Sequence, residues 1–357
     1  MSLSLIFALP TWQNWLMGFF IWVVAVGFLA LISYLITSAK SEALRGNIPD
    51  QAFTYSYRPD FIPENAFLLD THSHTIASDG WMTPEQNIKW HIANGFNAFV
   101  ITDHNTSESN PPSMQLQEKY PDILIIPGYE WTNPRVHINI LGVESFTKPS
   151  KRNPSDEEIR NIIKKGKEMG GIVQLDHYTW TQDRPEQRSG DFVHPSRKDL
   201  IEWGVDGFEI NNEMRWYDPK TVHLLNRWKN DGVIDRDIYM ATGTDVHNPL
   251  REWCTAWTEI LLTPEERKDV SWAVVKRALK EGRTRIWVDH DYRKPPESLY
   301  DKNEGSTKKK NLFAPFYGIV HGLLYVPGGV KGIISYIAWF LLAYFPIRGI
   351  FELIFLI

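Results

Sequence analysis

The stretch Ala66-Phe67-Leu68-Leu69-Asp70-Thr71-His72-Ser73-His74 ends an apolar run with an aspartate and two histidines one residue apart. Along an extended strand, residues i and i+2 point to the same face. His72 and His74 can therefore present both imidazoles to one metal ion if the segment is the carboxyl end of a strand. Histidine has many other roles, so the pair gains weight only from a wider pattern.

Such a pattern is present, because apolar runs bordered by a residue that can bind a metal recur along the chain. They are Phe99 to His104, Ile123 to Glu130, Val136 to Leu141, Gly171 to His177 and Met240 to His247. Strand-like and helix-like segments alternate between residues 64 and 290, which is typical of an α/β fold with a largely parallel sheet. In β/α barrels the carboxyl ends of the strands carry the chemistry. Most of these residues fall at such ends, whereas His137 falls near the start of its run.

Three segments carry the signature of a helix start. They are Thr83-Pro84-Glu85-Gln86, Ser155-Asp156-Glu157-Glu158 and Thr263-Pro264-Glu265-Glu266. Each has a capping residue with Gln or Glu three positions later, and two have proline at the first helical position. We therefore predict a helix at each of them.

With these motifs in place, the sequence resembles the PHP (polymerase and histidinol phosphatase) family. The family's four motifs match Asp70-Thr71-His72-Ser73-His74, Thr102-Asp103-His104, Asp176-His177 and Gly243-Thr244-Asp245-Val246-His247. The resemblance covers residues 64 to 290 and implies a distorted (β/α)7 barrel that holds three metal ions and hydrolyses phosphoesters. The metal ligands that it implies are His72, His74, Asp79, His104, Glu130, His137, His177, Asp245 and His247. One departure is Tyr178, which follows His177 where the family often has proline.

Six histidines and three carboxylates suit zinc, manganese or iron better than magnesium or calcium, which favour oxygen ligands. We therefore expect three divalent transition-metal ions as cofactors. A water shared by two such ions would be deprotonated near neutral pH and would act as the nucleophile, with Glu130 as the bridging carboxylate. Asp245 and His247 complete the predicted catalytic group.

Two further sets of residues are predicted to support this site. Asp70, Asp103 and Asp176 precede ligand histidines and are predicted to orient their imidazoles, with helix or turn capping at the strand ends as the alternative for Asp103 and Asp176. Arg135 and Arg251 lie on loops near ligands and are predicted to clamp a phosphate, with a solvated surface role as the alternative.

Both ends of the chain are strongly apolar. Residues 15–36 contain 22 residues without a charge, which as a helix would extend ~33 Å and cross a bilayer. A cleaved signal peptide is the alternative. Residues 313–357 carry only Lys331, Arg348 and Glu352 as charges, which fits either a second transmembrane helix or an interfacial segment. Basic residues after the first span place the central domain in the cytoplasm.

The predicted organisation has five parts. They are a transmembrane helix (1–38), a linker (39–63), a PHP-type hydrolase domain (64–290), a mobile linker (291–312) and a membrane-associated segment (313–357). The lone Cys254 excludes an intrachain disulfide and favours a reducing compartment. Residues 64–290 contain 27 Lys and Arg against 35 Asp and Glu, a net charge of −8, which argues against a nucleic-acid partner.

These features lead to one main hypothesis and two alternatives. The main one is a phosphoesterase anchored in the inner or plasma membrane, which hydrolyses a phosphomonoester or phosphodiester on a membrane-linked or small-molecule substrate. The second is a metal-dependent amidohydrolase-like enzyme that cleaves a C–N bond, although no lysine lies at a ligand-bearing strand end. The third is a non-catalytic membrane scaffold or sensor stabilised by metals. The sequence does not define an oligomeric state.

Overall fold

The computed structural model describes Phe19, Phe20, Val24 and Phe28 and then residues 44–149, 153–179, 194–212, 217–250 and 252–289. The chain divides into two compact units, and the unit Leu44–Lys302 contains every described strand. Apart from those four helical positions, the predicted span at 15–36 lies outside the described residues. So do residues 291–312 and 313–357. Within the described part of the chain, no helix has the length and apolar character needed to cross a bilayer.

The described strands form two sheets of five strands each. The first has the spatial order β10(Thr284–Val288), β9(Ala256–Ile260), β1(Phe67–Asp70), β2(Ala98–Val100) and β3(Leu124–Ile126). The second has the order β4(Gly128–Thr132), β5(His137–Leu141), β6(Ile172–Leu175), β7(Gly207–Asn212) and β8(Tyr239–Gly243). The protein therefore has a mixed α/β fold.

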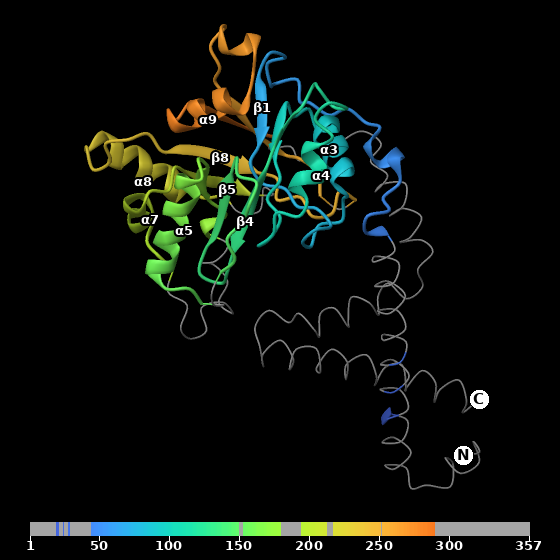
Figure 1. Ribbon diagram of the computed structural model, residues 1–357, viewed down its shortest axis with the longest axis horizontal. Helices are drawn as coiled ribbons and strands as arrows, with labels where there is room; N and C mark the ends of the chain where they lie inside the picture. The colour runs from blue at the N-terminus through green and yellow to red at the C-terminus, as the bar shows by residue number, and fades with distance from the viewer. Residues whose placement is uncertain are drawn as a thin grey trace, which may run out of the picture. The chain divides into compact units, whose positions relative to one another are not determined.

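Helices flank these sheets. The α-helices are α3(Pro84–Ala93), α4(Asn110–Met114), α5(Asp156–Glu168), α7(Arg197–Trp203), α8(Pro219–Asn230) and α9(Trp272–Lys280). Two 3-10 turns, η1(Asp50–Phe53) and η2(Glu266–Lys268), complete the described elements. In Figure 1, α3 and α4 lie together on one side of the strands, and α5, α7 and α8 lie on the other.

Half of the strand pairings are antiparallel, so the prediction of a largely parallel sheet is wrong. The pairs β1–β2, β2–β3, β6–β7 and β7–β8 are parallel. The pairs β4–β5, β5–β6, β1–β9 and β9–β10 are antiparallel. The reason is clear for β4 and β5, because residues 133–136 that join them are too few for the crossover that a parallel pair needs.

The run predicted as one strand from Ile123 to Glu130 is two strands in different sheets. It breaks at Pro127, which has no N–H to donate to a ladder. Two isolated parallel bridges, Ser73 with Val246 and His104 with Glu130, join the sheets just beyond the ends of β1, β8 and β2. A barrel of seven strand–helix units is not shown, because β3, β4 and β5 follow one another without a helix.

Two of the three predicted helix starts are confirmed. Thr83 forms a capping box with Gln86 at the start of α3, and Ser155 accepts a hydrogen bond from the backbone N of Glu158 at the start of α5. Thr263 and Glu266 also bond reciprocally. Only the turn η2 follows them, however, and α9 begins at Trp272. Asp269, with φ −149° and ψ 86°, ends the turn, so the prediction of a helix here was wrong.

Apolar side chains fix the strands that carry the site. Ile138, Val173 and Phe208 from neighbouring strands of the second sheet pack with Ile163 of α5 and Leu200 of α7 in one buried cluster. The face of α5 that packs against the core consists of Ile159, Ile162, Ile163 and Gly166, and its charged residues face outward. The strand ends that hold polar residues are therefore anchored on a rigid layer.

Candidate metal centre

The nine predicted ligands all fall within the described residues, and the structure brings them into one cluster. His72 and His74 follow β1, His104 follows β2, Glu130 lies in β4, His137 begins β5, His177 follows β6, and Asp245 and His247 follow β8. Because β5 is antiparallel to β4 and β6, its amino end lies beside the carboxyl end of β6. The reversed strand therefore explains how His137, the exception in the sequence pattern, reaches the same place.

Glu130 lies at the centre of the cluster and is fully buried. Its Oε2 lies 2.7 Å from Nδ1 of His104 and 3.4 Å from Nε2 of His72. Its Oε1 lies 2.5 Å from Nδ1 of His137 and 3.7 Å from Nε2 of His177. Oε2 also lies 3.6 Å from Nε2 of His74, so one carboxylate faces five imidazoles, which is the geometry expected of a ligand that bridges two ions.

Asp245 is a second point of convergence. Its Oδ1 lies 2.8 Å from Nε2 of His74 and 3.3 Å from Nε2 of His72. Asp245 and His177 have φ values of 50° and 23°, in the left-handed region that non-glycine residues rarely adopt. Backbone strain of this kind is concentrated at functional sites, where the surrounding structure maintains it.

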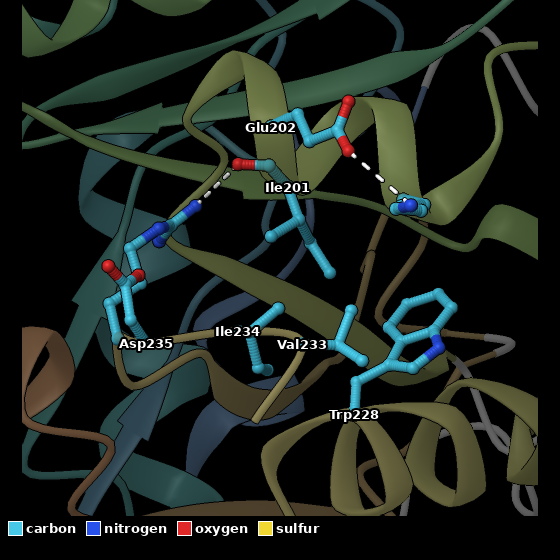
Figure 2. A pocket seen from close by; sticks show the side chains of 8 residues that line it. Ile201, Glu202, Trp228, Val233, Ile234 and Asp235 are labelled. Carbon is cyan, nitrogen blue, oxygen red and sulfur yellow. Dashed lines mark hydrogen bonds and ion pairs between the residues drawn. The ribbon is translucent and has the colours of Figure 1, made fainter. Parts of the chain in front are cut away.

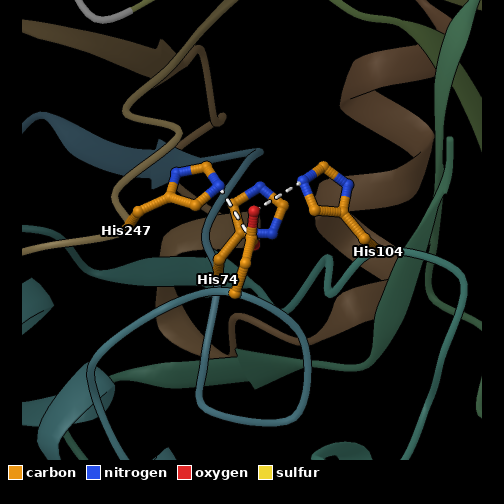
Figure 3. Close-up of side chains that lie close together, drawn as sticks. His74, His104 and His247 are labelled. Atoms are coloured by element: carbon orange, nitrogen blue, oxygen red, sulfur yellow. Dashed lines mark ion pairs between the residues drawn. The ribbon is translucent and has the colours of Figure 1, made fainter. Parts of the chain in front are cut away.

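The outer part of the cluster is formed by His74, His104, His247 and Asp79 (Figure 3). Nε2 of His247 lies 3.2 Å from Oδ1 of Asp79, and Nε2 of His104 lies 3.5 Å from its Oδ2. The His74 ring lies 4.1 Å from that of His247 and 4.4 Å from that of His104, between ring centroids. The side chain of Asp79 is 58% exposed, whereas those of His72 and Glu130 are buried. Solvent therefore reaches the cluster from the Asp79 side.

The protonation states follow from these contacts. Burial and the nearby His247 and His104 lower the pKa of His74 to about 4. Burial also lowers the pKa of His247, but the contact with Asp79 and the charge of Asp245 outweigh it and raise this pKa to about 10. In the metal-free protein His74 is therefore neutral at pH 7, and His247 is an imidazolium held by two carboxylates.

The donor atoms fit divalent metal ions. Four ligands about 2.0 Å from a tetrahedral ion lie about 3.3 Å from one another. Nε2 of His72 lies 3.4 Å and 3.3 Å from the carboxylates of Glu130 and Asp245. This nitrogen, both oxygens of Glu130 and Oδ1 of Asp245 are buried and have no well-aligned hydrogen bond. These atoms lie close together, but their geometry does not suit hydrogen bonds between them. An ion bound between them would satisfy them better.

The side chains of Asp70, Asp103 and Asp176, which precede ligand histidines, accept hydrogen bonds from groups other than the ligand imidazoles; Asp176 accepts from Nε2 of Gln174 at 2.9 Å. Asp70 accepts from Thr244 Oγ1 at 2.5 Å and lies 2.9 Å from Nε2 of His91. Asp103 accepts from the backbone N and the Oγ1 of Thr75, both at 2.7 Å. Asp103 therefore holds the loop that follows His74, and Asp70 links the segments after β1 and β8.

Glu209 on β7 is a residue of the cluster that the sequence pattern missed. It is 2% exposed, and its Oε1 lies 3.1 Å from Nδ1 of His72. The available signal was a carboxylate inside the apolar run Gly207-Phe208-Glu209-Ile210 of a strand that is buried on both faces. Buried carboxylates need a partner, so such a position indicates a site.

Of the two predicted phosphate-binding arginines, only Arg135 is described. The guanidinium of Arg135 donates to the carbonyl of Pro154 at 2.7 Å and to Asp156 Oδ1 at 2.5 Å, at the start of α5. A role in phosphate binding for Arg135 stays a prediction. Arg251 lies outside the described residues.

A pocket of about 240 Å³ lies at α7, α8 and the segment that follows α8 (Figure 2). Its lining is Lys198, Ile201, Glu202, Trp228, Val233, Ile234, Asp235 and Arg236. Arg236 is held by the carbonyls of Ile201 and Val205. None of the predicted ligands lines this pocket, so it is separate from the metal cluster.

Comparison with known proteins finds hydrolases. No protein-family model matches the chain. The 5'-3' exoribonuclease Rnm of Salmonella typhimurium and that of Escherichia coli are each 33% identical to it over 84 residues, which are 22% of this chain and 29% of each relative.

Two solved structures are also similar. One is a two-domain protein from Bacteroides vulgatus containing a predicted PHP-like metal-dependent phosphoesterase, at 20% identity and a TM-score of 0.49, covering 66% of this chain and 68% of that one. The other is an amidohydrolase from Chromobacterium violaceum with bound sulfate and no metal, at 16% identity and a TM-score of 0.39, covering 62% and 98%.

Proposed function

We propose that this chain is a metal-dependent phosphoesterase of the PHP type. The observation that carries the proposal is the convergence of six imidazoles and three carboxylates around the buried Glu130. A set of this size exceeds what one ion needs, since zinc takes about four ligands. We therefore retain three divalent ions, of zinc, manganese or iron, as the proposed cofactors.

We assign the proposed ions to separate groups of ligands. His74, Asp79, His104 and His247 would hold an ion at the solvent-facing side, and Glu130 with His72, His104 and His137 would hold ions inside. Bound ions would supply Lewis acidity, an activated water and neutralisation of charge on the phosphoryl oxygens. The protein's own contribution is to fix the ligands on strand ends and to leave the Asp79 side open to substrate.

The two similar exoribonucleases add nucleic acids to the classes of phosphoester that this chain could cleave. The expectation that nucleic acid is an unlikely partner is not supported, because both relatives are named as exoribonucleases. The net charge of −8 over residues 64–290 argues against a long duplex, but three divalent ions would reverse the local charge of the cluster. We propose phosphodiesters, including short single-stranded RNA, alongside small phosphomonoesters as substrates.

The membrane anchor is a separate part of the proposal. It rests on the uncharged stretch 15–36 and the apolar stretch 313–357 of the sequence. An anchor at the inner or plasma membrane would raise the concentration of the enzyme near a membrane-linked phosphate. Fractionation of cells that express the full chain, with a carbonate wash, tests it: release of the chain from the membrane pellet would contradict the anchor.

A metal-supplemented activity screen tests the function. The full chain, loaded with Zn²⁺ or Mn²⁺, is assayed on an aryl phosphate, a bis-aryl phosphate, a phospholipid, a short single-stranded RNA and an N-acyl amide. We expect phosphoester cleavage that chelation abolishes and that the His74→Ala variant lacks. Cleavage of the amide alone would favour the amidohydrolase alternative, and bound metal without turnover on any substrate would favour the scaffold alternative.

A further inference from the structure

Glu209 forms a buried pair with His72, one of the predicted metal ligands. Oε1 of Glu209 lies 3.1 Å from Nδ1 of His72, and both side chains are fully buried. The other ring nitrogen of His72, Nε2, lies 3.4 Å from Glu130 and 3.3 Å from Asp245. The imidazole therefore has Glu209 on one side and the carboxylates of the cluster on the other.

The second oxygen of Glu209 reaches two more ligands. Oε2 accepts from the backbone N of His177 at 2.8 Å and from Nδ2 of Asn212 at 3.0 Å. The same Nδ2 lies 3.1 Å from Oδ2 of Asp245. One carboxylate thus contacts His72 and His177 directly and Asp245 through Asn212. The latter two ligands are those with positive φ.

Gly243 at the end of β8 makes room for this pair. A Cβ at this position would lie 1.8 Å from Oε1 of Glu209 and 2.6 Å from Cβ of His72. No side chain fits there, so the glycine permits the close approach of β7 and the segment after β1. The contact therefore depends on three separate parts of the chain: Glu209 on β7, His72 after β1 and Gly243 on β8.

We propose that Glu209 is a positioning residue that fixes the ring of His72 and the backbone of His177 for metal binding. The inference rests on the proposed function, because it requires an ion on the Nε2 side of His72. A carboxylate accepts hydrogen bonds only, so Nδ1 of His72 must carry the proton and Nε2 keeps its lone pair for the ion. Glu209 lies with His72 and His177 in a group of atoms close enough to hold an ion themselves, but in the positioning role it touches neither the ion nor the substrate.

Glu209→Gln is the sharpest variant, because it keeps the size of the side chain. An amide has one accepting oxygen, yet His72 Nδ1–H and the backbone N–H of His177 both need an acceptor. If the new NH₂ group faces His72, Nδ1 must accept and the ring proton moves to Nε2, which faces the cluster. If it faces His177 instead, two donors, the NH₂ group and the backbone N–H, oppose each other. The matched control is Glu259→Gln, since Glu259 is also a buried strand carboxylate, but its Oε2 bonds to Trp287 Nε1 at 3.0 Å.

The test is zinc binding by the full-length chain, measured by elemental analysis after gel filtration and by competition with a chelating dye. For Glu209→Gln we expect loss of one zinc ion per chain or a loss of affinity of about 10- to 100-fold, and for Glu259→Gln no change. Thermal unfolding of both metal-free variants controls for a general effect on the fold. Wild-type zinc affinity and stoichiometry in a folded Glu209→Gln variant would overturn the inference.

A second measurement uses the wild-type protein. Nitrogen NMR of histidine-labelled, zinc-loaded protein, with His72→Gln for assignment, reports which ring nitrogen binds zinc. We expect Nε2 of His72 to bind the ion and Nδ1 to be protonated. Zinc on Nδ1 would make Glu209 a co-ligand and overturn the positioning role, and this measurement decides if Glu209→Gln does not fold. A wild-type chain that takes up no zinc would instead contradict the proposed function.

Discussion

Glu130 and His137 contact each other across the antiparallel pair β4 and β5, with 2.5 Å between Oε1 and Nδ1. Glu130 lies in the middle of β4 and His137 begins β5, so the antiparallel course of β5 brings them together. The same carboxylate faces four further imidazoles. It is therefore the residue whose removal should disturb the cluster most.

Glu130→Gln should abolish metal-dependent hydrolysis and lower the number of retained ions by at least one, because no neighbouring carboxylate replaces its two oxygens. Elemental analysis and the aryl phosphate assay measure this. Loss of a metal ligand of this kind costs at least about 100-fold in activity. Glu144→Gln, at an exposed position, is the control. Unchanged hydrolysis in Glu130→Gln would remove this residue from the mechanism.

Asp79→Asn should weaken the solvent-facing ion selectively. Asp79 contacts His104 and His247 but none of the buried ligands His72 and Glu130. Its side chain is 58% exposed, but it contacts the imidazolium of His247, so the metal-free variant should also lose part of the stabilisation by His247 near neutral pH. Metal titration should show one weakened site with the others retained. Loss of all bound metal would contradict the division into an outer and an inner part.

Metal binding should release protons, with an affinity that rises with pH. The contacts with Asp79 and Asp245 raise the pKa of His247 to about 10 in the metal-free protein, against about 6.5 when unfolded. An ion must displace this proton, so zinc affinity increases between about pH 6 and 8. Calorimetry in buffers of different ionisation enthalpy counts the protons. His247→Gln should release about one fewer, and an equal count would contradict this assignment.

The same pKa shift predicts the pH dependence of stability without metal. Between about pH 6.5 and 10, folded His247 holds a proton that the unfolded chain has lost. The stabilisation by His247 is thus complete below about pH 6.5 and is lost as the pH rises toward 10. Urea unfolding of the chelated protein along this range measures it. The His247→Gln variant should show a shallower decline.

Gly243→Ala should damage both the fold and the metal site. The added methyl would lie 1.8 Å from Oε1 of Glu209, so one of the two strands must shift. Overpacking of this kind costs about 1–3 kcal/mol, and the contact between Glu209 and His72 would be lost with it. Gly232→Ala is the comparison, because no atom lies within 4 Å of its Cβ position, although its φ of 68° adds backbone strain. Only the first variant should lose zinc.

His91→Ala should lower stability and leave metal binding unchanged. His91 is buried, with Nδ1 2.8 Å from the carbonyl of Asn87 and Nε2 2.9 Å from Asp70. Its ring stacks on Phe99 at 4.1 Å between centroids. Removal of such a hydrogen-bonded ring costs about 1–3 kcal/mol or more. Thermal unfolding and zinc stoichiometry separate this structural histidine from the ligands; fewer zinc ions per folded chain would contradict it.

The cluster could be predicted from sequence because its members sit at the borders of apolar runs, a local pattern. The antiparallel course of β5 could not, since pairing direction depends on long-range contacts and on a loop whose length matters more than its composition. β9 was missed for a similar reason: it pairs with both β10 and β1, but its five residues carry no metal ligand that would mark them. Glu209 was missed because one carboxylate in a strand resembles a surface residue until burial is known.

The difference in exposure between Asp79 and Glu130 also has a kinetic meaning. An ion held beside the exposed Asp79 can leave by exchanging ligands with water. An ion beside Glu130 and His72 is shielded from solvent, so it can leave only when neighbouring strand ends separate. Chelation of the loaded protein should therefore proceed in a fast and a slow phase. The outer site, at Asp79, would set how quickly the enzyme responds to a change in metal supply. The inner sites, at Glu130 and His72, would keep the metals that were bound first.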